Sequence, residues 1–156
     1  MAIMEIKKMG DPVLKQVCVP VDKITKKVKT LLDNMAETMY KNEGVGIAAP
    51  QVGVSIRAVV IDVDNKHRYE LINPVITSRE GTVIDSEGCL SFPGLYGEVE
   101  RAEKVSVEYT NRFGKKKTLD ADGLLARCIQ HEVDHLDGQL FIEIAKNLTQ
   151  KTSQND

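Results

Sequence analysis

Residues 123–138 read GLLARCIQHEVDHLDG, and the rest of this 156-residue chain is best interpreted outward from them. Asp122 followed by Gly123 is typical of a helix start, and Asp137 followed by Gly138 is typical of a helix end. We therefore expect a helix that runs to about Leu136.

Two histidines in this helix form a candidate metal site. His131 and His135 are four residues apart, which places both imidazoles on one face of the helix. Glu132 projects about 100° further around, from where its carboxylate can reach a water on the ion without binding the ion. Such a carboxylate can take a proton from water and deliver it to a leaving amine. Because the pattern fixes only three positions, a chance pair of histidines is the alternative.

A third ligand must come from elsewhere in the chain. Downstream of His135 there is no further histidine, and His67 lies in a polar turn. Cys89 is the better candidate, because it sits in the small-residue turn 86–91 where a thiolate can face an ion. The alternative for a lone cysteine is a buried small apolar residue. A sulfur and two imidazoles leave a fourth position open, which is typical of a catalytic site.

The remaining patterns predict a single α+β domain, with mostly antiparallel strands packed around the metal-binding helix. Apolar residues at three- and four-residue spacing predict an earlier helix from about Lys23 to Tyr40, capped by Asp22. A short helix is expected over residues 13–17. Strands are expected at 56–63, 71–77, 82–85, 105–110, 117–121 and 140–144. We expect the catalytic domain to span residues 1–146, followed by a polar, loosely held tail over 147–156.

Composition excludes several classes of function. The formal net charge of -2 gives no general electrostatic reason to expect DNA or RNA binding. Three cysteines, an odd number, together with the lack of a secretory segment argue against a disulfide framework. No apolar run reaches the length of a membrane span. We therefore expect a cytoplasmic protein without a DNA or membrane partner.

A third segment, GVGIAAPQ at Gly44–Gln51, stands out for its small residues. Two glycines and two alanines allow another part of the chain or a ligand to approach the backbone closely. Gln51 can donate its amide N–H to an oxyanion. From this segment alone, the simpler interpretation is a tight turn with a solvated glutamine.

Together, Gly44–Gln51, Glu87–Ser91 and His131–His135 resemble the signature set of the peptide deformylase family. That family carries Gly-x-Gly-x-Ala-Ala-x-Gln, Glu-Gly-Cys-Leu-Ser and His-Glu-x-x-His in this order, and the resemblance extends from about Gly10 to Phe141. It implies removal of the formyl group from N-formylmethionine on newly made polypeptides, with release of formate. It also implies nascent chains as partners and a transient association with the ribosome.

The resemblance further implies a role for each candidate residue. The implied metal ligands are Cys89, His131 and His135. Glu132 is implied as the general base and acid, and the oxyanion donors are the side chain of Gln51 and the backbone N–H of Leu90. The implied substrate-binding residues are Val45, Gly46, Leu124, Cys128 and Ile129.

Two lines of argument on the ion disagree. Ligand chemistry favours Zn²⁺ for one sulfur and two imidazoles. The resemblance implies one divalent ion, with Fe²⁺ native, Ni²⁺ or Co²⁺ as active substitutes, and Zn²⁺ less active. We expect Fe²⁺ in the cell and Zn²⁺ in aerobically purified protein.

Neighbours of the signature residues add one expectation and two departures. We expect Glu87 to pair with Arg101 and thereby steady the loop that carries Cys89. Arg127 stands where an apolar residue also occurs in relatives, and Tyr96 lies where some members carry an arginine.

Two other functions compete with the deformylase interpretation. A zinc peptidase of the His-Glu-x-x-His type would take its third ligand from a residue other than Cys89. A non-catalytic relative that uses metal only for folding would lack Glu132 or Gln51, and the chain has both.

Overall fold

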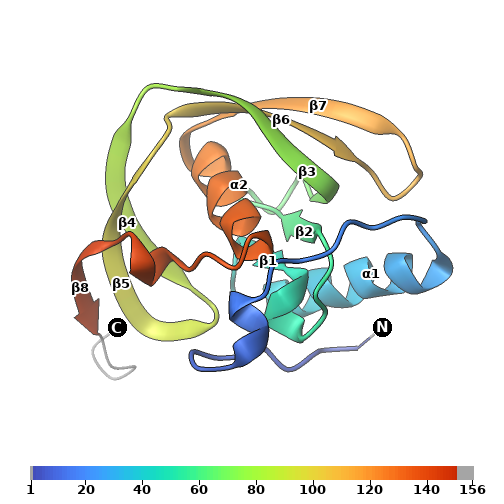
Figure 1. Cartoon of the computed structure of the whole chain (residues 1–156), viewed down its shortest axis with the longest axis horizontal. Coiled ribbons are helices and arrows are strands. Elements are labelled where there is room, and N and C mark those ends of the chain that lie inside the picture. The colour runs from blue at the N-terminus through green and yellow to red at the C-terminus, as the bar shows by residue number, and fades with distance from the viewer. Residues whose placement is uncertain (1, 151–156) are drawn as a thin grey trace.

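Two antiparallel sheets enclose one central helix in the computed structural model, which describes residues 2–150 (Figure 1). The helices are α1 (Lys26–Lys41) and α2 (Gly123–Leu136), and the 3-10 turns are η1 (Pro12–Lys15), η2 (Ala49–Val52) and η3 (Phe141–Glu143). The strands are β1 (Gly46–Ala48), β2 (Ala58–Ile61), β3 (Tyr69–Glu80), β4 (Val83–Cys89), β5 (Phe92–Arg101), β6 (Lys104–Thr110), β7 (Lys116–Asp122) and β8 (Lys146–Gln150).

The strand pairing confirms the predicted α+β domain. The larger sheet has the order β1-β2-β3-β6-β7 and the second sheet has the order β4-β5-β8, with every neighbouring pair antiparallel. Figure 1 shows α2 in the middle, with β6 and β7 above it and β4 and β5 to one side. No helix within residues 2–150 is both long enough and apolar enough to cross a membrane.

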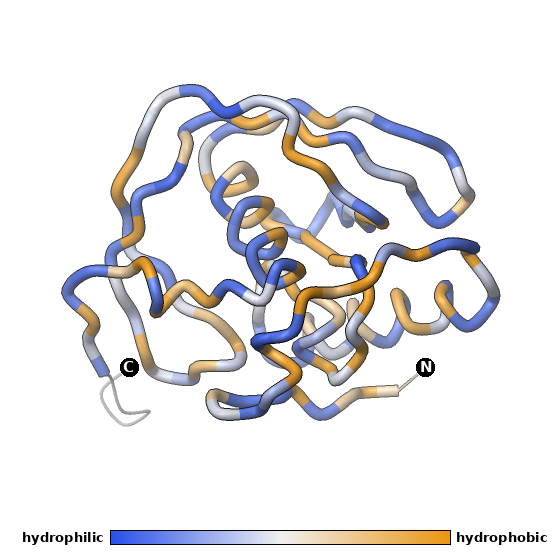
Figure 2. Tube along the Cα trace, viewed as in Figure 1, coloured by the Kyte–Doolittle hydropathy of each residue, from blue (hydrophilic) through white to orange (hydrophobic). Residues whose placement is uncertain are grey.

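Helix α2 is held by the hydrophobic core of the larger sheet. Ile129 and Leu136 are fully buried, in one cluster with apolar residues of β2, β3 and β6. Figure 2 shows hydrophilic and hydrophobic residues alternating along β6, where Val105 and Val107 are buried against α2. Burying one such side chain contributes about 1.5–3 kcal/mol. The apolar face of α2 thus fixes the helix, and its polar residues are free to form a site.

Helix α1 packs against the other face of the same sheet. Leu32, Met35 and Met39 are fully buried there with residues of β1 and β2. The predicted start at Lys23 with Asp22 as the cap is wrong. Thr25 caps the helix instead, because its hydroxyl accepts a hydrogen bond from the backbone N–H of Val28 (3.3 Å).

The second sheet has a hydrophobic core of its own. Leu14, Phe92, Val99, Leu140 and Phe141 form this cluster, and the Phe92 and Phe141 rings meet edge to face with their centroids 5.7 Å apart. The apolar run 140–144 therefore forms the 3-10 turn η3, and the strand predicted there is wrong. Similarly, the predicted helix over residues 13–17 is the short 3-10 turn η1.

Two strands of the second sheet were missed or misjudged by sequence patterns. β5 contains Pro93, Gly94 and Gly97, which interrupt any strand pattern, yet it pairs with β4 through a two-residue turn. The loosely held tail expected from residue 147 is wrong for residues 147–150. They belong to β8, which pairs with β5 even though its side chains are exposed, because the pairing uses backbone groups. Residues 151–156 lie outside the described part of the chain.

Candidate metal centre

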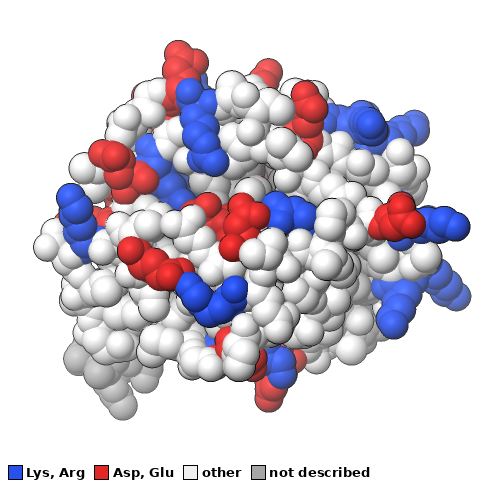
Figure 3. Space-filling model, in the orientation of Figure 1, with Lys and Arg blue, Asp and Glu red and all other residues white. Residues whose placement is uncertain are grey.

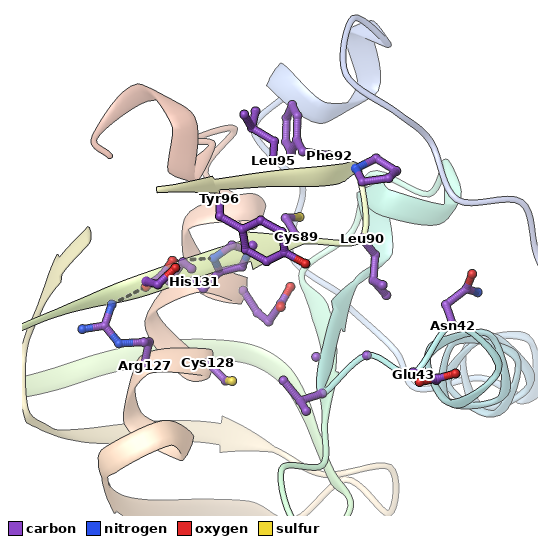
Figure 4. Close-up of a pocket in the computed structure, with 18 of the residues that line it drawn as sticks. Asn42, Glu43, Cys89, Leu90, Phe92, Leu95, Tyr96, Arg127, Cys128 and His131 are labelled. Atoms are coloured by element: carbon purple, nitrogen blue, oxygen red, sulfur yellow. Dashed lines mark hydrogen bonds and ion pairs between the residues drawn. The ribbon is translucent and has the colours of Figure 1, made fainter. Parts of the chain in front are cut away.

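Three potential metal ligands converge where the second sheet meets α2. Cys89 is the last residue of β4, and His131 and His135 lie on α2. The Cys89 Sγ is 3.3 Å from His135 Nε2, and one ligand atom from each of the three residues lies within 4.8 Å of the others. Figure 4 shows Cys89 and His131 close together beside the pocket. The third ligand expected from sequence is therefore in place.

The chemistry and spacing of these donors fit one divalent ion. Metal–sulfur and metal–nitrogen distances of about 2.3 and 2.0 Å in a tetrahedral site place the two donor atoms about 3.5 Å apart. The separation of Cys89 Sγ and His135 Nε2, 3.3 Å, agrees with this value. Burial lowers the pKa of His135, so its imidazole stays neutral as a ligand requires.

Glu87 supports this set from behind. Its Oε1 lies 2.8 Å from His131 Nδ1, and a carboxylate accepts, so His131 donates there and its Nε2 is left for the ion. Arg101 donates to Glu87 from Nε (2.9 Å) and Nη2 (3.0 Å), which confirms the predicted pair. Burial disfavours the Glu87 carboxylate, but its hydrogen bonds with His131 and Arg101 outweigh burial and lower its pKa to about 2.

Glu132 is a buried carboxylate next to the ligands. Its side chain is 5% exposed, and its Oε1 finds no hydrogen-bond partner among residues 2–150. Burial raises the pKa of Glu132 to about 7. A Cβ on Gly46 would lie 2.7 Å from Glu132 Oε2, so this close approach requires glycine.

Gln51 closes the other side of the centre. It is 1% exposed, so the simpler interpretation of a solvated glutamine is wrong. Its Oε1 accepts a hydrogen bond from the Ala48 N–H (2.9 Å), and its Nε2 donates to Ser91 Oγ (3.2 Å) and Cys89 Sγ (3.4 Å). The amide donor is thereby oriented toward the metal centre.

A pocket of about 620 Å³ opens onto Cys89, His131 and Glu132 (Figure 4). Among the residues implied for substrate, Val45, Gly46, Leu124 and Cys128 line it, as does Leu90. Ile129 does not, because it is fully buried in the core behind. Several other residues also line the pocket although no sequence pattern pointed to them, namely Lys8, Asn42, Glu43, Phe92, Pro93, Gly94 and Leu95. Most of these lie on β5, the strand that no sequence pattern revealed.

The arrangement defines a class of protein. Three protein ligands leave a fourth position for water, and a buried carboxylate with an unpartnered oxygen stands next to them in a pocket. Catalytic metal sites have these parts, whereas structural sites use four protein ligands. The chain is a metal-dependent hydrolase.

Comparison with known proteins gives the family. The family model for polypeptide deformylase matches residues 3–151. The chain belongs to this family. It is 53% identical to the peptide deformylase of Desulfitobacterium hafniense over 151 residues, which cover 97% of this chain and 100% of that protein.

Solved structures agree with the sequence comparison. The crystal structure of peptide deformylase from Thermotoga maritima matches with a TM-score of 0.89 and 41% identity, covering 92% of this chain and 98% of that one. The enzyme from Thermus thermophilus matches with a TM-score of 0.87 and 48% identity, covering 90% and 84% respectively. The chain therefore removes the N-formyl group from nascent polypeptides.

Proposed function

We propose that Glu132 moves the proton when this enzyme hydrolyses the formyl group of an N-formylmethionyl peptide and releases formate. The observation that carries this role is the buried Glu132 carboxylate, whose Oε1 has no partner within residues 2–150. Burial raises its pKa to about 7, so the carboxylate can take a proton from water and return it at the same pH. Glu132 then delivers this proton to the amine nitrogen as the bond between that nitrogen and the formyl carbon breaks. The products are formate and the free amino terminus of the peptide.

Cys89, His131 and His135 would hold the ion in this reaction. When bound, the ion polarises the formyl carbonyl and lowers the pKa of a water molecule at the open position. We propose Fe²⁺ as the native ion, with Ni²⁺, Co²⁺ or Zn²⁺ as substitutes. The test is metal analysis of anaerobically prepared protein, together with the activity measured for each ion. A Zn²⁺ preparation more active than the Fe²⁺ preparation would contradict the proposal.

Gln51 Nε2 and the backbone N–H of Leu90 are the proposed donors to the substrate oxygen on which negative charge develops. Two features support this role. The Gln51 amide is held in place by Ala48 and Ser91, and Leu90 lies in the turn directly after Cys89 and lines the pocket. Losing one such donor typically costs about 3–4 kcal/mol of transition-state stabilisation.

The substrate enters along the pocket in this proposal. Gly46, on the edge strand β1, offers its backbone to the extended peptide. The methionine side chain lies against apolar residues of the pocket wall, namely Val45, Leu124 and Cys128. Burial raises the pKa of the Cys128 thiol to about 12, so this residue serves as an uncharged wall and not as a nucleophile.

The proposed place of action is the cytoplasm, at the ribosome, where nascent chains emerge. Lysines are exposed at the start of α1 (Lys26 and Lys27) and beside the β6–β7 turn (Lys115–Lys117). Figure 3 shows basic side chains gathered at this end of the molecule. Attraction to ribosomal RNA through them is weak and salt-dependent. Cosedimentation with ribosomes that does not weaken as salt is raised would contradict this contact.

The test of the proton-transfer role is formate release by Glu132→Ala and Glu132→Gln variants. Both are expected to bind the metal and to lose roughly 10²–10⁴ in kcat, the usual contribution of a general acid–base group. Metal content measured on the same samples is the control. A variant that retains its metal and turns over at the wild-type rate would overturn the role of Glu132.

A further inference from the structure

We infer that Arg127 is a positioning residue for the metal centre. Its side chain fastens the strand that carries the cysteine ligand to the helix that carries the histidines. Nothing in the sequence assigned it a role, yet Arg127 is 8% exposed and lies one turn before His131 on α2. Figure 4 shows Arg127 and His131 joined to the carboxylate between them, which belongs to Glu87. The inference rests on the metal site and not on the identity of the substrate.

The two halves of the site are packed separately. Among the described residues, the hydrophobic cluster that holds α2 contains no residue of β4, β5 or β8. The cluster of the second sheet contains no residue of α2. Cys89 belongs to the second sheet, whereas His131 and His135 belong to α2. The ligand geometry therefore depends on contacts across the junction between the two clusters, which include the His131–Phe141 ring contact and the hydrogen bonds of Glu87, Arg101 and Arg127.

Arg127 contacts both strands across this junction. Its Nη1 donates to Glu87 Oε2 (2.6 Å) and to the Val99 carbonyl (2.9 Å), and its Nη2 donates to the Val83 carbonyl (2.8 Å). One side chain of α2 thus holds both β4 and β5. An ammonium group also has three N–H donors, but they sit on one nitrogen, whereas the guanidinium places donors on separate nitrogens that can reach acceptors on both strands.

Charge balance across the junction points to the same residue. Two carboxylates, Glu87 and Asp134, share Arg101, which donates to Asp134 Oδ2 (2.5 Å) as well as to Glu87. Arg127 is the second cation of this group. Without it, two acids would compete for one guanidinium, and a buried negative charge would be left without full compensation. The Glu87 carboxylate that accepts from Arg127 also contacts His131 Nδ1. Without Arg127 this carboxylate would be less well fixed, and so would the His131 ring.

The test is the rate at which the Co²⁺-loaded enzyme releases its ion to an excess of chelator. Arg127→Met keeps the unbranched stem of the side chain but lacks the guanidinium, so it removes all three hydrogen bonds. We expect release to be about 10- to 100-fold faster, the usual effect of losing such support behind a ligand. The Co²⁺ absorption spectrum, which reports ligand geometry, is expected to change as well.

Arg112→Met is the matched control. Arg112 is also partly buried and also forms a two-fold pair with an acid, Glu70, but that pair lies far from the ligands, between the β6–β7 turn and β3. The control is expected to keep the wild-type release rate and spectrum. Equal acceleration in both variants would show a general loss of stability and would overturn the inference. A wild-type rate in Arg127→Met would also overturn it.

Arg127→Lys keeps the test valid if the methionine variant does not fold. Lysine keeps a positive charge beside the Glu87 carboxylate, but a single ammonium cannot reach carbonyls on both strands. Release is expected to be several-fold faster than in the wild type, and slower than in any folded methionine variant. A lysine variant that releases Co²⁺ at the wild-type rate, with an unchanged spectrum, would overturn the inference.

Discussion

Gly46 matters to this site through the side chain that it lacks. The sequence indicated only that Gly44 and Gly46 allow a close approach, because it could not show what approaches them. The structure supplies the two neighbours, Leu90 at Gly44 and the Glu132 carboxylate at Gly46. Helical spacing predicted the two histidines and the place of Glu132. The small-residue turn and the family resemblance predicted Cys89, and a lone acid next to that ligand predicted the Arg101–Glu87 pair. Arg127 was missed because a lone buried arginine has no pattern in a single sequence.

Gly46→Ala is expected to displace the Glu132 carboxylate without unfolding the protein. The added Cβ would lie 2.7 Å from Glu132 Oε2, the mobile end of that side chain, so the carboxylate moves and the fold does not. A misplaced catalytic group costs roughly 10² in rate, which is the expected fall in kcat/KM for formate release.

Gly44→Ala is the matched control for this change. Its Cβ would press on the Leu90 side chain and not on Glu132, so a smaller loss of rate is expected. If the two alanine variants lost activity equally, the fall could not be assigned to Glu132.

The two helices and most strands of the larger sheet could be predicted because their patterns are local. Helix α2 begins and ends as expected, and β6 and β7 match their predicted ranges within one residue. Of the second sheet, the sequence predicted only the start of β4, as the strand expected at 82–85. Strand β5 is built around two glycines and a proline, and β8 has no buried side chain, so neither has the alternation that identifies a strand. Because β5 could not be recognised, the pocket residues that it carries were missed as well.

Asn73 fixes an irregular place within β3. It has a positive φ of 52°, and its side chain exchanges two hydrogen bonds of 2.8 Å with the Val21 backbone, where the register with β6 shifts. Asn73→Ala is expected to lower the free energy of unfolding by about 3 kcal/mol. About 1 kcal/mol comes from each hydrogen bond, and about 1 kcal/mol from alanine in the left-handed region.

Urea unfolding checks this expectation, with Asn73→Gly as the control. Glycine adopts a positive φ without strain, so its loss should be smaller than that of alanine. Activity per folded molecule should not change in either variant, because Asn73 is remote from the metal centre. An alanine variant as stable as the glycine variant would refute the contribution of the backbone conformation.

The whole molecule is two separately packed sheets joined at a metal site. An ion that binds Cys89 on one side and two histidines on the other adds a link that the unfolded chain lacks. At an ion concentration a thousand times the Kd, this binding stabilises the fold by about 4 kcal/mol. Chelation is therefore expected to lower the Tm by roughly 10 °C for a domain of this size.

Cys89→Ala provides the control for chelation, because it lacks one ligand. Its Tm should respond little to the chelator, and should lie near that of the stripped wild type. If chelation left the Tm of the wild type unchanged, the ion would not join the two sheets.

Deformylation itself separates this enzyme from a peptidase that uses the same helix motif. The measurement is mass spectrometry of formyl-Met-Ala-Ser after incubation with the metal-loaded wild-type protein. We predict formate and intact Met-Ala-Ser, because the proposed mechanism places the formyl group, and not an internal peptide bond, beside the open metal position and Glu132. Cleavage of an internal peptide bond, or no product at all from protein that holds its metal, would contradict the account.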